Sequence, residues 1–227
     1  MFISAILVAA GKSKRFKDKA SKVILKLNSR PIIAYSLDTL NSHPEIKEII
    51  VVANPRNIAG LAAIIRKNKF HKVVKVVLGG KERKDSVAQG LRAVNPKAGF
   101  MLIHDAARPF ITAALVSLVI NEARKSKAAI LGIPVKATIK MVRGSKVEKT
   151  VDRSGLWEIQ TPQVFEKGLI LKAYRKFGRS KVTDDAGLVE KSGKPVKVAA
   201  GSSLNIKITT PEDMLIAKGI AKIWKPA

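Results

Sequence analysis

Cationic side chains follow a small-residue loop near the start of the chain, a pattern that can hold phosphate groups. The stretch AAGKSKRF begins at Ala9 and contains Gly11 and Arg15, and Lys22 follows a few residues later. Small residues let backbone N–H groups approach phosphate oxygens, while the cations neutralise their charge. The P-loop and the dinucleotide-binding signatures are both absent, because their required glycines are missing. The stretch predicts a polyphosphate-binding loop, with ordinary surface lysines after a strand as the alternative.

A second glycine-rich turn, GGKERKDS, contains Gly80, Arg83 and Ser86. Its backbone amides and the Ser86 hydroxyl could read the edge of a base, and the Arg83 guanidinium could hold a phosphate. An ordinary turn between a strand and a helix explains the same residues equally well.

A single carboxylate, Asp105, stands in the stretch HDAARPF at the end of an apolar segment. Because Mg²⁺ prefers one or two carboxylates together with phosphate oxygens, Asp105 is a candidate ligand for magnesium or for a hydroxyl. The neighbouring His104 fits a packed strand residue better than a catalyst. Neither a Ser/His/Asp triad nor a close pair of carboxylates is evident.

Strand-like and helix-like segments alternate through the first 135 residues or so and would position these loops. Short apolar runs predict strands at residues 3–9, 46–53, 72–78, 100–104 and 128–134. Apolar residues at helical spacing predict helices at residues 31–41, 58–65, 87–94 and 115–122. The alternation predicts an α/β, Rossmann-like, mostly parallel sheet with helices on both faces. Ligands bind such sheets at the carboxyl ends of the strands.

A β-hairpin arm at about residues 136–153 interrupts this alternation. Arg143, Gly144 and Ser145 form the expected turn. Since two strands are rarely stable alone, we expect the arm to pack on another subunit. Beyond it we expect a helix at residues 167–176, a short helix capped by Thr183, strands at residues 196–200 and 204–209, and a last helix capped by Thr210. The whole chain, residues 1–227, then forms one domain.

The composition excludes several classes of protein and site. The 227 residues include no cysteine, which excludes disulfides and thiolate metal sites. They include three histidines, which are scattered along the chain. Apolar runs are far shorter than the roughly 20 residues that a bilayer requires, and the first strand leaves no room for a leader, so we expect a cytoplasmic protein. The net charge of +26 is spread along the chain, without aromatic residues alternating with basic ones, and this pattern argues against nucleic acid as a partner.

Taken in order, the motifs resemble the 2-C-methyl-D-erythritol 4-phosphate cytidylyltransferases, enzymes of non-mevalonate isoprenoid biosynthesis. The first loop occurs across sugar nucleotidyltransferases, but the combination of motifs is far more restrictive, and it runs from the first strand to the last helix. The resemblance implies the nucleotide-diphospho-sugar transferase fold, CTP and methylerythritol phosphate as substrates, Mg²⁺, and a homodimer with shared active sites. The stretches that carry it are AAGKSKRF, SKVILKL, GGKERKDSV, HDAARPF, VDRSGLWEIQTPQVF, VTDDAGLVE and GSSLNIKITTPEDM.

The resemblance also implies a role for each candidate residue. Catalytic roles, in stabilising charge at the α-phosphate or positioning the attacking phosphate, fall to Arg15, Lys22, Arg153 and Lys207. CTP binding falls to Ala9, Ala10, Gly11, Gly80, Arg83, Ser86, Asp105 and Ala106. Sugar-phosphate binding falls to Arg108, Thr138, Arg153, Thr161, Thr183 and Lys207. Asp105 is also the implied metal ligand, and Thr138 and Arg153 are implied to come from the arm of a neighbouring subunit.

The implied reaction agrees with these residue types. A phosphate monoester is already a nucleophile near neutral pH, so its attack on CTP needs alignment and cations and no catalytic base. Two alternatives remain open. A ribitol-5-phosphate cytidylyltransferase shares most of the motifs, although such enzymes more often read HDAVRPF. A non-catalytic, basic nucleic-acid-binding protein could have kept the fold, but the intact set of candidate site residues argues against it.

Overall fold

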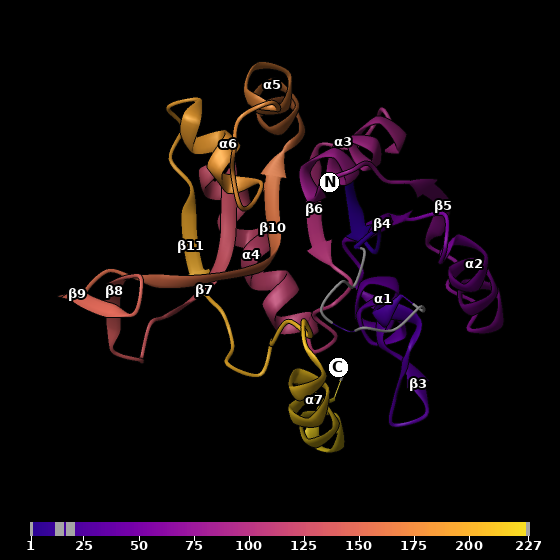
Figure 1. The fold of residues 1–227 in the computed structure, drawn as a ribbon. Coiled ribbons are helices and arrows are strands. Elements are labelled where there is room, and N and C mark those ends of the chain that lie inside the picture. The colour runs from indigo at the N-terminus through magenta and orange to yellow at the C-terminus, as the bar shows by residue number, and fades with distance from the viewer. Residues whose placement is uncertain (1, 12–15, 17–20, 226–227) are drawn as a thin grey trace.

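A seven-stranded mixed sheet forms the centre of the protein (Figure 1). The computed structural model describes residues 2–11, 16 and 21–225. The strand order is β11-β7-β10-β6-β1-β4-β5, and every neighbouring pair is parallel except those of β10, which runs antiparallel to β6 and β7. The strands are β1 (Ile3–Val8), β4 (Ile46–Ala53), β5 (Val73–Leu78), β6 (Phe100–Asp105), β7 (Ala128–Pro134), β10 (Trp157–Glu166) and β11 (Lys197–Ala200).

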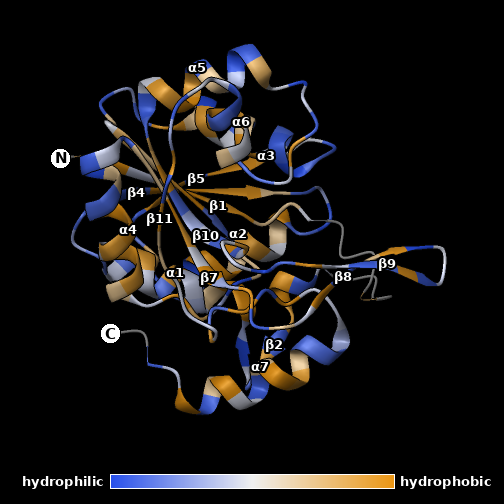
Figure 2. Ribbon diagram, turned by 90° about the vertical axis from the view of Figure 1, so that its left-hand side faces the viewer, coloured by the Kyte–Doolittle hydropathy of each residue, from blue (hydrophilic) through white to orange (hydrophobic). Residues whose placement is uncertain are grey.

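Helices cover both faces of the sheet, because the strands are apolar on both sides. Along β1, Leu7 belongs to one buried cluster and Ile6 to the other. The first cluster takes in α1 (Ile32–Ser42), α2 (Ile58–Lys67) and α4 (Ala113–Ser126). The second takes in α3 (Arg83–Ala93), α5 (Lys167–Phe177) and α6 (Ala186–Lys191). Figure 2 shows the strands largely in the hydrophobic colour and the helices in both colours. The predicted α/β class is confirmed.

A third, smaller apolar cluster holds the last helix, α7 (Pro211–Ile223), against the start of α1. Tyr35 packs edge-on against Phe110, and Trp224 closes the group with a tilted ring 5.3 Å from Tyr35. The short elements η2 (Lys22–Ile24), β2 (Lys26–Leu27) and β3 (Arg30–Pro31) lead into this cluster. Thr210 caps α7 as predicted, by accepting a hydrogen bond from the Asp213 N–H.

The predicted hairpin arm is confirmed as β8 (Ile139–Arg143) and β9 (Lys146–Val151), which pair with each other in a separate sheet. Gly144 has φ +58°, the left-handed conformation that this turn requires. Figure 1 shows the arm extending from the body of the molecule. Met141, Val142 and Val147 are 46%, 52% and 59% exposed on it.

The short elements η2, β2 and β3 were not predicted, and three others differ from the sequence expectation. Strand β10 was not predicted, because its residues lie beyond the region where strands and helices alternate. The strand predicted at residues 204–209 is wrong: this segment crosses the carboxyl edge of the sheet, where Ile208 N donates to the Ala107 carbonyl. The short helix begins after Asp185 and not after Thr183. Among the described residues, none of the helices is long and apolar enough to cross a membrane.

Candidate active site

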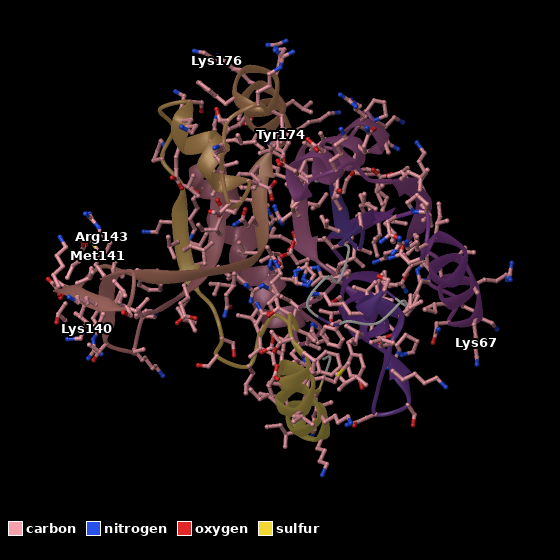
Figure 3. All side chains as sticks on the ribbon, viewed as in Figure 1. Lys67, Lys140, Met141, Arg143, Tyr174 and Lys176 are labelled. Atoms are coloured by element: carbon pink, nitrogen blue, oxygen red, sulfur yellow. The ribbon has the colours of Figure 1, made fainter. Side chains whose placement is uncertain are left out.

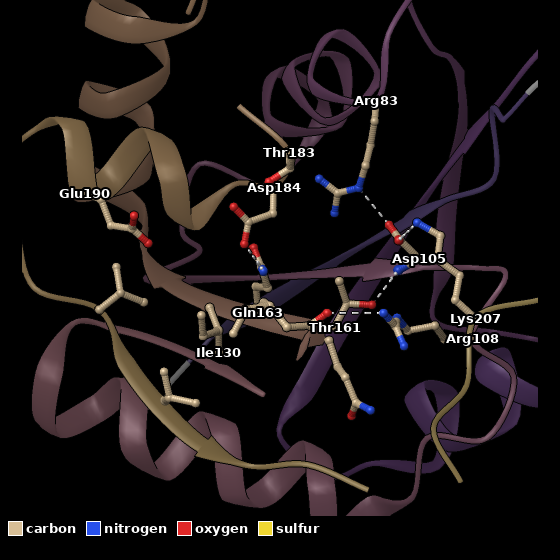
Figure 4. A pocket seen from close by; sticks show the side chains of 14 residues that line it. Arg83, Asp105, Arg108, Ile130, Thr161, Gln163, Thr183, Asp184, Glu190 and Lys207 are labelled. Carbon is tan, nitrogen blue, oxygen red and sulfur yellow. Dashed lines mark hydrogen bonds and ion pairs between the residues drawn. The ribbon is translucent and has the colours of Figure 1, made fainter. Parts of the chain in front are cut away.

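Two cavities open at the carboxyl ends of the central strands and share one wall. The loop cavity, about 430 Å³, lies between the loop after β1 and the start of α3. The β10 cavity, about 570 Å³, lies beside β10 (Figure 4). Arg83, Asp105 and Lys207 line both. Each volume falls in the range of small-ligand sites. The shared wall sits where the strand order reverses between β1 and β6, the usual binding position in such sheets.

The carboxylate of Asp105 is the centre of this wall. Lys207 Nζ donates to Oδ2 at 2.6 Å, and Arg83 Nε donates to Oδ1 at 2.8 Å. Burial alone would raise the pKa of Asp105, but the charges of Arg83 and Lys207 outweigh it and hold that pKa well below its usual range. Asp105 is therefore ionised, and it gathers two cations between the cavities.

Arg83 is fixed by a second carboxylate that the sequence reading missed. Its Nη1 donates to Asp185 Oδ2 at 2.8 Å, and the Tyr174 hydroxyl donates to Asp185 Oδ1 at 2.5 Å. Burial opposes the charge on Arg83, but Asp185 and Asp105 outweigh it and raise its pKa. The motif VTDDAGLVE contains Asp185, yet no local pattern indicates that it pairs with a residue 102 positions earlier.

The second glycine turn forms as predicted at the start of α3. A Cβ on Gly79 would lie 2.7 Å from Ala10 Cβ, and one on Gly80 would lie 2.3 Å from Asp85 Cβ, so both positions require glycine. Ser86 Oγ accepts from Gly80 N at 3.2 Å and donates to the Glu82 carbonyl at 3.0 Å. The Ser86 hydroxyl therefore also shapes the turn that lines the loop cavity.

Two asparagines that precede α2 hold the loop after β1. Asn57 Nδ2 donates to the Ala9 carbonyl at 2.9 Å, and Asn54 Nδ2 donates to the Ala10 carbonyl at 3.2 Å. The two asparagines also bond to each other in a turn, with Asn54 N donating to Asn57 Oδ1 at 2.8 Å. The sequence reading missed them, although an N-x-x-N turn after a strand is a local signal that could have found them.

Arg108 enters the β10 cavity from the loop after β6. Its Nη1 donates to the Asn205 carbonyl at 2.7 Å, and its Nη2 to the Ile159 carbonyl at 3.3 Å. Burial lowers the pKa of Arg108, which remains a cation at neutral pH. Thr161 lies beside it because β10 runs antiparallel to β6, which brings the first half of β10 to the carboxyl end of the sheet.

The structure brings most of the predicted site residues together. The loop cavity is lined by Ala9, Ala10, Gly11, Lys22, Gly80, Arg83, Ser86, Asp105 and Lys207. The β10 cavity is lined by Arg83, Asp105, Arg108, Thr161, Thr183 and Lys207. Ala106 is fully buried, with its N–H donating to the Val8 carbonyl, and its neighbour Ala107 lines the loop cavity instead. Arg15 lies outside the described residues.

Thr138 and Arg153 are exposed at the base of the arm and line neither of these two cavities. Arg153 Nη1 donates to the Lys136 carbonyl, which ties the two ends of the arm together. The sequence assigned both residues to the site of another subunit, and the arm of this chain carries them away from its own cavities.

The donor set at Asp105 fits one particular kind of metal site. In the described part of the chain, no group of three or more His, Cys, Asp or Glu residues could hold a metal ion. Asp105 offers two carboxylate oxygens, each of which retains a lone pair after its hydrogen bond to a cation. These residues fit a magnesium ion that takes most of its ligands from a bound polyphosphate, and they do not fit a cage built by protein side chains alone.

Comparison with known proteins agrees with this geometry. The sequence model of the 2-C-methyl-D-erythritol 4-phosphate cytidylyltransferase family matches residues 3–222. Curated proteins of that name from Desulforamulus reducens and Halalkalibacterium halodurans are 43% and 39% identical; each alignment covers 97% of this chain, and 96% and 97% of those proteins.

Solved structures agree as well. The crystal structure of 4-diphosphocytidyl-2C-methyl-D-erythritol synthase from Anaerococcus prevotii has a TM-score of 0.85 at 36% identity, covering 97% of this chain and 98% of that one. The 2-C-methyl-D-erythritol 4-phosphate cytidylyltransferase from Thermus thermophilus has a TM-score of 0.80 at 29% identity, covering 98% of this chain and all of that one. The resemblance inferred from the motifs is confirmed: this chain belongs to the 2-C-methyl-D-erythritol 4-phosphate cytidylyltransferase family.

Proposed function

We propose that the protein transfers the cytidylyl group of CTP to 2-C-methyl-D-erythritol 4-phosphate, with release of pyrophosphate. The observation that carries this proposal is the shared wall of the two cavities, because a transfer between two substrates needs both to meet at one set of charges. The loop cavity takes CTP, and the β10 cavity takes the sugar phosphate.

The reaction is an in-line displacement at the α-phosphorus. A phosphate oxygen of methylerythritol phosphate forms the new P–O bond, and the bond to the β-phosphate bridging oxygen breaks. Its electron pair leaves with pyrophosphate. Because the attacking phosphate oxygen is already ionised near neutral pH, no proton has to be removed from the nucleophile. Lys207 and Arg83 stand between the two cavities, where they align the reacting phosphates and offset the negative charge that accumulates.

The remaining cations divide between the substrates. Lys22 lines the loop cavity and faces the triphosphate, and Arg15, in the same loop of the sequence, is assigned to the α-phosphate. Arg108 lines the β10 cavity, where its planar guanidinium suits a phosphate monoester. Ala9, Ala10 and Gly11 hold the nucleotide through backbone groups, and Gly80 and Ser86 from the second turn recognise cytosine.

Magnesium belongs to this proposal with Asp105 as its protein ligand and the triphosphate of CTP as the source of its other ligands. When bound, it would offset phosphate charge and orient the triphosphate. In this structure Arg83 and Lys207 hold the Asp105 carboxylate in position.

A homodimer with shared active sites is the second part of the proposal. The arm is a two-stranded sheet with exposed apolar side chains, which a second subunit would cover. Thr138 and Arg153 would then reach the sugar phosphate bound to the neighbouring chain, with Arg153 and Lys207 positioning the attacking phosphate. A cytoplasmic location, expected from the sequence, completes the proposal.

The test is pyrophosphate release from CTP and Mg²⁺, with methylerythritol phosphate and ribitol 5-phosphate in parallel tubes. Release with methylerythritol phosphate alone supports the proposal. Release with ribitol 5-phosphate alone keeps the mechanism and moves the substrate to the second candidate. Folded protein that is silent in both tubes refutes the enzymatic proposal.

No observation favours nucleic-acid binding. Figure 3 shows the labelled side chains of Lys67, Lys140 and Lys176 at three widely separated extremities of the molecule. These three positive charges, among the residues that the structure describes, lie apart from one another and do not follow a single line.

A further inference from the structure

His104, on β6 next to Asp105, connects two residues of the β10 cavity from inside the protein. Its side chain is fully buried. Its Nδ1 lies 2.9 Å from the Thr161 hydroxyl oxygen, and its Nε2 lies 3.0 Å from the Arg108 carbonyl oxygen. Both Thr161 and Arg108 line the cavity.

The direction of each hydrogen bond follows from groups that can only donate or only accept. A carbonyl oxygen only accepts, so His104 Nε2 carries a proton and donates it to Arg108. A backbone N–H only donates, so Asp105 N donates to Thr161 Oγ1 over 3.0 Å. Because the His104 ring is fully buried, the charged form is disfavoured and the imidazole is neutral. With its proton on Nε2, the ring has a lone pair on Nδ1, and the Thr161 hydroxyl donates to that lone pair.

These hydrogen bonds leave the Thr161 hydroxyl with one unused lone pair on its oxygen. Its only proton goes to His104, and one of its two lone pairs accepts from Asp105. The remaining lone pair can accept from a ligand O–H and cannot donate to a phosphate oxygen. The hydroxyl groups of a sugar phosphate can donate to it, whereas its ionised phosphate oxygens cannot.

We propose that His104 is a positioning residue, which fixes the Thr161 hydroxyl as a hydrogen-bond acceptor for a hydroxyl group of the substrate and holds the Arg108 loop for its phosphate. The identity of that substrate as methylerythritol phosphate rests on the function proposed above. Ser36 supports the same loop, because its hydroxyl donates to the Arg108 carbonyl at 3.0 Å and lies 3.5 Å from His104 Nε2.

The chain offers a matched control in His43, a second buried histidine. Its Nε2 lies 2.9 Å from Ser117 Oγ, and its Nδ1 accepts from Glu45 N at 3.3 Å. Neither partner lines either cavity. A loss of packing alone would affect variants of His43 and His104 alike.

The first test reads the tautomer directly and needs no activity. The ¹⁵N chemical shifts of the imidazole nitrogens distinguish the two neutral tautomers and the cation, and His104→Asn assigns the signal among the three histidines. We expect His104 with its proton on Nε2 at neutral pH. A proton on Nδ1, or a doubly protonated ring, would overturn the proposal.

The second test separates the two bonds of His104 by kinetics. Asn places an oxygen near the position of Nδ1 and keeps an acceptor for Thr161, whereas Gln places its amide near Nε2 and keeps the bond to Arg108. Since one hydrogen bond to Thr161 is at stake, we expect His104→Gln to raise KM for methylerythritol phosphate about tenfold. His104→Asn, in which Ser36 still donates to the Arg108 carbonyl, should raise it less than about threefold. KM for CTP should stay unchanged in both variants. His43→Gln should change neither KM. The proposal would be overturned if both His104 variants raised KM for methylerythritol phosphate equally and raised KM for CTP by the same factor.

The third test applies even where the His104 variants do not fold. Thr161→Ser keeps the hydroxyl, and Thr161→Val removes it. We expect Thr161→Val to raise KM for methylerythritol phosphate about tenfold, as the loss of one hydrogen bond predicts, while inorganic phosphate, used as a probe, binds both variants with unchanged affinity. Weaker binding of inorganic phosphate to Thr161→Val would mean that the hydroxyl contacts phosphate and would overturn the proposal. Wild-type protein that releases no pyrophosphate with methylerythritol phosphate refutes the proposed function alone, because the tautomer and phosphate-binding tests still apply.

Discussion

Lys207 Nζ lies 2.6 Å from Asp105 Oδ2, although 102 residues separate the two along the chain. Arg83 completes the group on the other carboxylate oxygen, and all three residues line both cavities. Asp105 thus holds two cations at the boundary between the cavities, where their charge can act on both substrates.

Removing the charge of Lys207 should slow the chemical step. We expect Lys207→Gln to lower kcat by about 10²–10³-fold, the usual effect of removing one preorganised group that stabilises transition-state charge. Steady-state kinetics with both substrates provide the measurement. Lys172→Gln, on the exposed side of α5, is the matched control and should keep wild-type kinetics. A kcat within twofold of wild type for Lys207→Gln would contradict this role.

Asp185 should contribute to stability as well as to the position of Arg83. We expect Asp185→Asn to lower the free energy of unfolding by about 3 kcal/mol, because it leaves the buried Arg83 guanidinium without one of its two carboxylates. Tyr174→Phe removes one hydrogen bond to the same carboxylate and should cost about 1–2 kcal/mol. Urea denaturation monitored by circular dichroism measures both values. If Asp185→Asn had the wild-type free energy of unfolding, the ion pair between Asp185 and Arg83 would not contribute to stability.

The magnesium requirement should depend on Asp105. Chelation of divalent ions should abolish pyrophosphate release, and adding Mg²⁺ should restore it. Asp105→Asn keeps the shape of the side chain and weakens it as a ligand, so the Mg²⁺ concentration for half-maximal activity should rise about tenfold. A magnesium titration at saturating CTP gives this value. An unchanged half-maximal concentration would remove Asp105 from the list of metal ligands.

Shared active sites can be tested by mixing two impaired variants, assayed at a sugar-phosphate concentration at which each alone has little activity. Arg153→Ala should weaken the use of the sugar phosphate, and Lys22→Ala should lower turnover by about 10²–10³-fold as a lost phosphate contact, while both keep the fold. In a mixed dimer, one site combines the intact Lys22 of one chain with the intact Arg153 of the other. An equimolar mixture that exchanges subunits should therefore recover about a quarter of wild-type activity.

The control for the mixing experiment pairs Lys22→Ala with Lys207→Gln. Both residues line the cavities of their own chain, so each site of a mixed dimer keeps at least one of the two defects. We expect no recovery in this pair. Recovery in both mixtures, or in neither, would argue against an arm that supplies Arg153 to the neighbouring chain.

Stability should fall in mild acid because of His43. Burial, reinforced by the charge of Lys72, lowers the pKa of His43 below its usual value of 6.5 in the folded protein. Below about pH 6.5 the unfolded chain therefore takes up a proton that the folded protein does not, and the free energy of unfolding declines by at most about 1.4 kcal/mol per pH unit. Above that pH the His43 imidazole is neutral in both the folded and the unfolded chain, so it no longer makes stability depend on pH.

The comparison of wild type with His43→Gln isolates this contribution. Denaturation at pH 7, 6 and 5 should show a steeper loss of stability in the wild type than in the variant. Parallel slopes would mean that His43 is protonated as easily in the folded state as in the unfolded one.

The sequence by itself determined the parts of the protein that depend on local patterns. Apolar runs and helical spacing predicted the parallel strands and the helices between them, and the Gly144 turn predicted the arm. Gly80 and Asp105 were identified as site residues because each follows a strand, and the carboxyl ends of parallel strands meet at one edge of the sheet.

Only the tertiary structure decided how distant segments complete the site. Strand β10 inserts antiparallel between β6 and β7, and this brings Thr161 to the carboxyl end of the sheet. Asp185, which pairs with Arg83, and Thr161, which bonds to His104, come from segments far along the chain, so no local spacing could reveal them. Local structure follows from steric and hydrogen-bonding preferences of neighbouring residues, whereas the pairing of buried charges and polar groups depends on which segments the packed core brings together.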